Sequence, residues 1–88
     1  MTAVSKEEIR NEVRRYLLTE FLPGEDPAAL EDTTPLISGG ILDSIASVKL
    51  VSHLEEKYGI RFEAHEVSVD YLETVELVVD TVHRKLGG

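Results

Sequence analysis

One serine lies in a setting that suits covalent modification. Ser44 follows Asp43, comes a few residues after Gly39-Gly40 and begins an apolar repeat of helical period. Backbone amides at a helix N-terminus point outward and the dipole there is positive, so a phosphodiester on the Ser44 hydroxyl would be stabilised. Taken locally, an Asp-Ser pair before an apolar helix more often serves only as a helix cap. These residues alone therefore favour a cap and leave modification open.

Hydrolysis by Ser44 is a competing interpretation that geometry disfavours. His53 lies nine residues further along the same predicted helix, which displaces it by roughly 13.5 Å from Ser44. The surrounding residues lack a Gly-x-Ser-x-Gly elbow, and so short a chain offers no evident oxyanion hole. The three histidines, His53, His65 and His83, also lack metal-ligand spacing. We therefore expect a non-catalytic chain without a metal site.

A helix over 44–58 is predicted to present Ser44. Apolar residues recur there at three- and four-residue steps, which is the period of a helix with one apolar face. Asp43 or Ser44 suits its N-cap, and Gly59 follows where a left-handed residue would end it. The expected apolar stripe consists of Ile45, Val48, Val51, Leu54 and Tyr58.

Two further helices are predicted to support this one. Ser5 and Glu8 have the spacing of a capping box, and the apolar stripe that follows predicts a helix over 5–21. Thr74 suits the cap of a last helix over 74–86, whose valines recur at helical spacing despite their preference for strands. Residues 68–72 are expected to form one or two helical turns before it.

A long loop is expected between the first two helices. Residues 22–43 are rich in Pro, Gly and small polar side chains, while Leu30, Leu36 and Ile37 are apolar enough to hold the loop against a core. The sequence thus predicts one all-α domain over 1–88. Its expected architecture is an up-and-down bundle of three main helices plus a short third helix.

Composition limits the partners of this domain. The formal net charge of −8 disfavours nucleic acid and anionic membrane surfaces. Cysteine is absent, so any thiol chemistry needs an added group. No apolar run reaches the ~20 residues of a membrane span, and the first ten residues lack the layout of a secretory signal. We therefore expect a cytoplasmic monomer.

A longer pattern surrounds Ser44. It runs Gly39-Gly40-Ile41-Leu42-Asp43-Ser44-Ile45 and continues with Val48, Leu50, Leu54, Glu55, Glu56, Tyr58 and Gly59. This pattern resembles the phosphopantetheine attachment region of acyl and peptidyl carrier proteins, whose usual core is Asp-Ser-Leu, then Val-x-Leu and an acidic pair before an aromatic. The order of the helices and the long loop also resembles that family. The resemblance thus extends over the whole chain and outweighs the cap-only interpretation.

This resemblance implies a passive carrier. A phosphopantetheinyl transferase would attach a 4'-phosphopantetheine arm from coenzyme A to Ser44, beside Asp43. The thiol of the arm would hold an acyl or aminoacyl group as a thioester, received from a loading enzyme and passed to a downstream synthase, transferase or tailoring enzyme. The implied docking surface lies beside the long loop and the short third helix and contains Leu42, Ile45, Val48 and Lys49.

Two departures from the family pattern bear on the pathway. Fatty-acid carriers commonly have acidic residues at the positions of Ala46 and Lys49. Because interface charge governs encounter and partner choice, the difference favours a freestanding carrier of secondary-metabolite biosynthesis, making a polyketide, a nonribosomal peptide or a related product. A carrier of fatty-acid synthesis is the alternative.

Two alternatives belong to other functional classes. Gly87-Gly88 at the end of the sequence resembles the terminal diglycine of ubiquitin-like sulfur carriers, but those proteins need a β-grasp sheet for which the chain has few strand candidates. The second is a helical interaction module with an unmodified Ser44.

Overall fold

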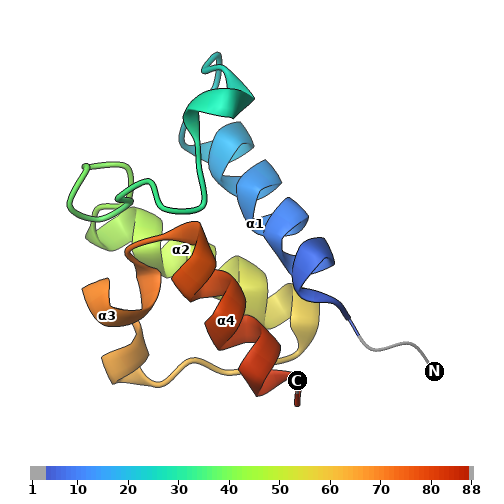
Figure 1. Ribbon diagram of the computed structural model, residues 1–88. Coiled ribbons are helices and arrows are strands. Elements are labelled where there is room, and N and C mark those ends of the chain that lie inside the picture. The colour runs from blue at the N-terminus through green and yellow to red at the C-terminus, as the bar shows by residue number, and fades with distance from the viewer. Residues whose placement is uncertain (1–3, 88) are drawn as a thin grey trace.

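A computed structural model describes residues 4–87 and contains three long helices and one short one. As Figure 1 shows, α1 (Lys6–Glu20) and α4 (Val75–Lys85) lie side by side, and α2 (Ser44–Tyr58) crosses behind α4 in this view. The short α3 (Val69–Leu72) precedes α4. The prediction of an all-α bundle is confirmed. The β-grasp alternative is not supported, because residues 4–87 contain no strand, and Gly88 lies outside the described residues.

The predicted caps explain where the helices begin and end. The Ser5 hydroxyl accepts the Glu8 amide at 3.2 Å, and the Thr74 hydroxyl accepts the Leu77 amide at 3.1 Å. Gly59 has φ 66°, and its amide donates to the carbonyl of Glu55 at 2.8 Å, so it ends α2 in the left-handed conformation that favours glycine. Predicted and observed helix bounds therefore agree within one residue.

The core is formed by one face of each long helix. Its α1 members are Ile9, Val13 and Leu17, and its α4 members are Val75, Val78, Val79 and Val82. In the stripe predicted for α2, Val51 and Leu54 are buried, whereas Ile45 and Val48, which were also predicted for the docking surface, are 69 % and 57 % exposed. Each three-residue step along a helix falls about 60° short of a full turn. Ile45 and Val48, at the start of the stripe, therefore point away from the face that packs in the core. The buried face of α2 instead consists of Ala46, Ser47, Leu50, Val51 and Leu54.

The connection between α1 and α2 is held against this core. Leu30 and Leu36 are buried as predicted. Arg14 donates to the carbonyl oxygens of Leu30 and Pro27, which secures the first half of the connection to α1.

Two short 3₁₀ helices, Pro27–Ala29 and Ala64–Glu66, were not predicted. Within residues 4–87, no helix combines the length and apolar character needed to span a membrane.

Candidate functional site

Ser44 is the first residue of α2, and its side chain is exposed. The cap of the helix is its neighbour Asp43, whose Oδ1 accepts the Ala46 amide at 2.7 Å. The Asp43 carbonyl accepts the Ser47 amide at 2.9 Å. Among residues 4–87, the Ser44 hydroxyl has no hydrogen-bond partner. Asp43 therefore performs the capping, and the Ser44 hydroxyl is free to react.

The start of α2 has the electrostatics that an attached phosphodiester needs. The amides of Ser44 and Ile45 form no hydrogen bond with any other residue in the described part of the chain. Such amides carry the positive end of the helix dipole and bind anionic oxygen atoms. The exposed hydroxyl and these two donors fit a phosphate ester on Ser44.

Leu42 holds the chain immediately before this site. Its side chain is 2 % exposed and packs in the core. The carbonyl of Leu36 accepts the amides of both Ile41 and Leu42 at 2.8 Å. The expectation that Leu42 forms part of an exposed docking surface therefore needs correction. Burial of the Leu42 side chain in the core is more favourable in free energy than its exposure to water. The buried side chain anchors the segment that carries Ser44.

An open groove of about 550 Å³ runs beside Ser44. One side comes from the loop before α2, the floor from α2 itself, and the other side from the residues that lead into α3. The docking surface was expected beside the long loop and the short third helix, and both line this groove, although Val67 and Val69 were not among the predicted residues. The groove is lined by Ile37, Leu42, Asp43, Ser44, Ser47, Val48, Val67, Ser68 and Val69.

Exposed apolar side chains lie next to Ser44. Ile45 and Val48 on α2 are accompanied by Val69 on α3, which is 46 % exposed. Lys49 is exposed one turn beyond Ile45, and no ion pair involves it among residues 4–87. Three of the four predicted docking residues, Ile45, Val48 and Lys49, thus lie on the accessible surface.

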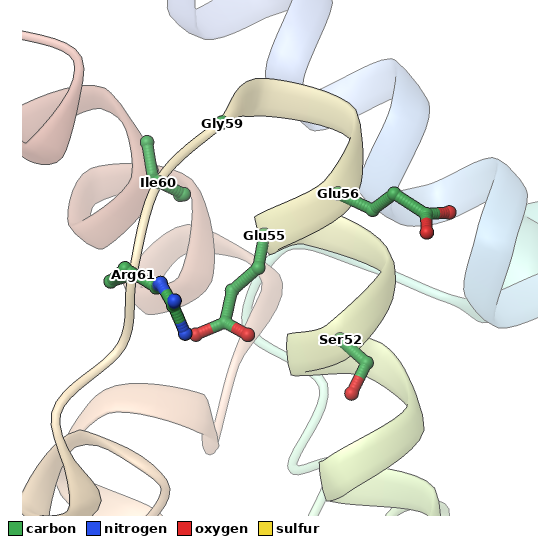
Figure 2. Close-up of a pocket in the computed structure, with 6 residues that line it drawn as sticks. All are labelled: Ser52, Glu55, Glu56, Gly59, Ile60 and Arg61. Atoms are coloured by element: carbon green, nitrogen blue, oxygen red, sulfur yellow. The ribbon is translucent and has the colours of Figure 1, made fainter.

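A second hollow lies at the opposite end of α2. Figure 2 shows it between the last turns of α2 and the irregular segment that follows, with Glu55 and Arg61 among the lining side chains. Glu55 is eleven residues beyond Ser44, a displacement of roughly 16 Å along the helix. Its Oε2 accepts the Phe62 amide at 2.8 Å, so this carboxylate holds the turn after α2 and is not directed toward the Ser44 site.

Two of the histidines have defined side-chain contacts. His53 contacts Glu12, and the ring of His65 packs edge-on against Tyr71 at a centroid distance of 5.7 Å. Within the described range 4–87, no three His, Cys, Asp or Glu side chains gather in a way that could hold a metal ion.

Comparison with known proteins agrees with the geometry around Ser44. Residues 8–82 match the family described as "Phosphopantetheine attachment site". In structure, the chain is similar to one from a crystal structure described as that of an "FAD-dependent dehydrogenase", with a TM-score of 0.71 and 28 % identity. That likeness covers 80 % of this chain and 97 % of the other. No curated protein sequence matches the chain. Because the matched region includes most of the chain and the whole of α2, the chain belongs to the phosphopantetheine-attachment family of carrier proteins.

Proposed function

We propose that the protein is a carrier that holds acyl or aminoacyl groups as thioesters on a 4'-phosphopantetheine arm attached to Ser44. The observation that carries this proposal is the exposed Ser44 hydroxyl, which has no hydrogen-bond partner among residues 4–87 and sits at the N-terminus of α2. When bound, the arm supplies a thiol, which the chain itself lacks because it has no cysteine.

The attachment reaction requires little from the carrier. In a phosphopantetheinyl transferase, the Ser44 oxygen attacks the phosphorus next to the pantetheine of coenzyme A. A new P–O bond forms, adenosine 3',5'-bisphosphate leaves, and the hydroxyl proton passes to a base of the transferase. Asp43 fixes the start of the helix through the Ala46 amide, so Ser44 is presented in a defined position.

Delivery requires a surface that partner enzymes bind. Ile45 and Val48 are the exposed apolar residues nearest Ser44, and exposed apolar side chains beside a reactive position are typical of a binding surface. Lys49 adds a positive charge to a chain of net charge −8. The position of this cation favours dedicated partners of secondary-metabolite biosynthesis, with fatty-acid synthesis as the alternative.

The structural relative supports the proposal of one class of tailoring partner. The matched chain has only about 70 residues, the size of a carrier domain, in a structure named for an FAD-dependent dehydrogenase. We include such a dehydrogenase among the proposed partners. A thioester acidifies the hydrogen on its α-carbon, so loss of that proton and transfer of a β-hydride to the oxidised flavin would give an unsaturated thioester and reduced flavin.

Intact-mass measurement tests the attachment site. After incubation with coenzyme A, Mg²⁺ and a transferase of broad specificity, the chain should gain one phosphopantetheine group. Ser44→Ala should remain at its original mass, whereas Ser52→Ala, which alters another exposed serine of α2, should be modified like the wild type. An unmodified interaction module would leave all three proteins at their original masses, and that result would overturn the proposal.

A further inference from the structure

Glu73 connects the junction of α3 and α4 to the loop before Ser44. Its Oε1 accepts the amides of Ile37 and Ser38 at 3.0 and 2.9 Å. Its carbonyl oxygen accepts the Leu36 amide at 2.6 Å. One residue thus binds three consecutive backbone amides of a loop that lies more than thirty residues away in sequence.

The bound loop segment in turn holds the start of α2. The carbonyl of Leu36 accepts the amides of Ile41 and Leu42, and Leu42 is followed directly by Asp43 and Ser44. A continuous series of hydrogen bonds therefore runs from Glu73 to the second residue before Ser44. Backbone position here depends on these bonds, because the loop has no regular secondary structure to fix it.

Glu73 also joins the two sides of the groove beside Ser44. Ile37, whose amide it binds, lies on the loop side. Val67 and Val69 lie on the other side, and α3 ends at Leu72, next to Glu73 in sequence. Loss of the carboxylate would let the two sides move relative to each other.

We propose that Glu73 is a positioning residue for the carrier reaction: its carboxylate fixes the 36–42 loop against α3 and thereby sets both the presentation of Ser44 and the width of the groove. The inference rests on the proposed attachment at Ser44. A carboxylate that accepts two amides forms charge-assisted hydrogen bonds, which are stronger than neutral ones. Hydrogen bonds from Ser38 and, to a smaller extent, from the Ile37 amide hold the pKa of Glu73 below its ordinary value. The carboxylate is therefore ionised at neutral pH.

Three variants separate positioning from general stability. Glu73→Ala removes both side-chain bonds, while Glu73→Gln keeps an amide oxygen that can accept them. Glu76→Ala is the matched control, because Glu76 is an exposed carboxylate in the first turn of α4 and its side chain has no hydrogen bond or ion pair with the described residues. Amide exchange of the unloaded proteins and steady-state loading by a broad-specificity transferase are measured on each.

We expect amide exchange of Ile37 and Ser38 to accelerate at least tenfold in Glu73→Ala, while exchange in the middle of α1 is unchanged. The KM for loading should rise about fivefold with little change in kcat, because fewer molecules present Ser44 correctly but those that bind react normally. Glu73→Gln should recover most of both effects, and Glu76→Ala should behave like the wild type.

Unchanged exchange and unchanged KM in Glu73→Ala would overturn the inference. It would also be overturned if Glu76→Ala raised KM equally, since the effect would then reflect lost charge alone. A wild-type chain that no transferase loads would instead contradict the attachment proposal, and amide exchange would still test the connection between Glu73 and the loop. If Glu73→Ala does not fold, Glu73→Gln supplies the comparison through a smaller change in the same two measurements.

Discussion

Glu12 on α1 and His53 on α2 meet at 2.7 Å between Oε2 and Nε2. The imidazole also stacks on Tyr16 of α1, with ring centroids 4.1 Å apart. Arg15 binds the same carboxylate through two nitrogens, at 3.1 and 2.6 Å. The hydrogen bonds from Arg15, and then from His53, lower the pKa of Glu12 from its ordinary value of 4.5 to about 2. These contacts join the two helices outside the core.

This junction predicts a pH-dependent stability. Because the pKa of Glu12 is lower in the folded chain than in the unfolded one, its contribution is present above pH 4.5 and is lost as pH falls toward 2. Glu12→Gln should lower the free energy of unfolding at pH 7 by about 1 kcal/mol. Urea unfolding should show this difference shrinking between pH 4.5 and 2. Glu56→Gln, at an exposed position of α2, should have little effect. An equal loss of stability for Glu12→Gln at pH 7 and at pH 2 would contradict the lowered pKa of Glu12.

Local sequence patterns were sufficient to place the long helices. For α2, the spacing of apolar residues together with Gly59 gave both ends, Ser44 and Tyr58. Caps such as Thr74 act through amides only three residues away, so their partners can be read from the chain. The valines of α4 formed a helix despite their strand preference, because burial of their common face outweighs the weak local preference.

Contacts between segments that are distant in sequence could not be predicted from local sequence patterns. Nothing around Glu73 distinguishes it from the other acidic residues, and its importance arises only when the fold brings it to Ile37 and Ser38. His53 lies on α2 as predicted, but its contact with Glu12 depends on how α1 and α2 pack. The family resemblance placed Ile45 on the docking surface, whereas its apolar spacing alone does not show which part of the stripe the small core covers.

Gly39→Ala should destabilise the loop before Ser44. A Cβ at Gly39 would meet the carbonyl oxygen of Pro35, and because that atom is backbone, the loop must shift to make room. We expect a loss of about 1–3 kcal/mol in urea unfolding, as for other overpacked sites. Thr33→Ala, at an exposed position of the same loop, should change stability by less than about 0.5 kcal/mol. Equal stabilities for these two variants would contradict the predicted clash.

The ion pair between Lys85 and Glu66 should contribute more than the exposed pair between Lys6 and Asp80. Nζ of Lys85 lies 2.6 Å from Oε1 of Glu66, with side chains 18 % and 10 % exposed, against 52 % and 47 % in the other pair. Lys85→Met leaves a carboxylate with little access to water and should cost about 2 kcal/mol. Lys6→Met should cost at most about 1 kcal/mol.

A double-mutant cycle measures the coupling within the Lys85 and Glu66 pair. Adding Glu66→Gln to Lys85→Met removes the unpaired charge, so the second substitution should cost at least about 1 kcal/mol less than it does in the wild-type background. Additive losses in thermal or urea unfolding would show that the two side chains act independently.

Ile45 provides the sharpest test of the docking surface, because its exposure separates binding from folding. A side chain that is 69 % exposed contributes little to the core, so Ile45→Ser should change the free energy of unfolding by less than about 0.5 kcal/mol. If Ile45 contacts the enzymes that act on Ser44, the KM for loading should rise about tenfold, corresponding to about 1.4 kcal/mol of lost binding. Leu77→Ser is the matched control, since Leu77 is an exposed apolar residue on α4. Loading that is equally fast for both variants would place the contact surface elsewhere, whereas a selective loss for Ile45→Ser, at unchanged stability and unchanged amide exchange around Ser44, supports contact with a partner.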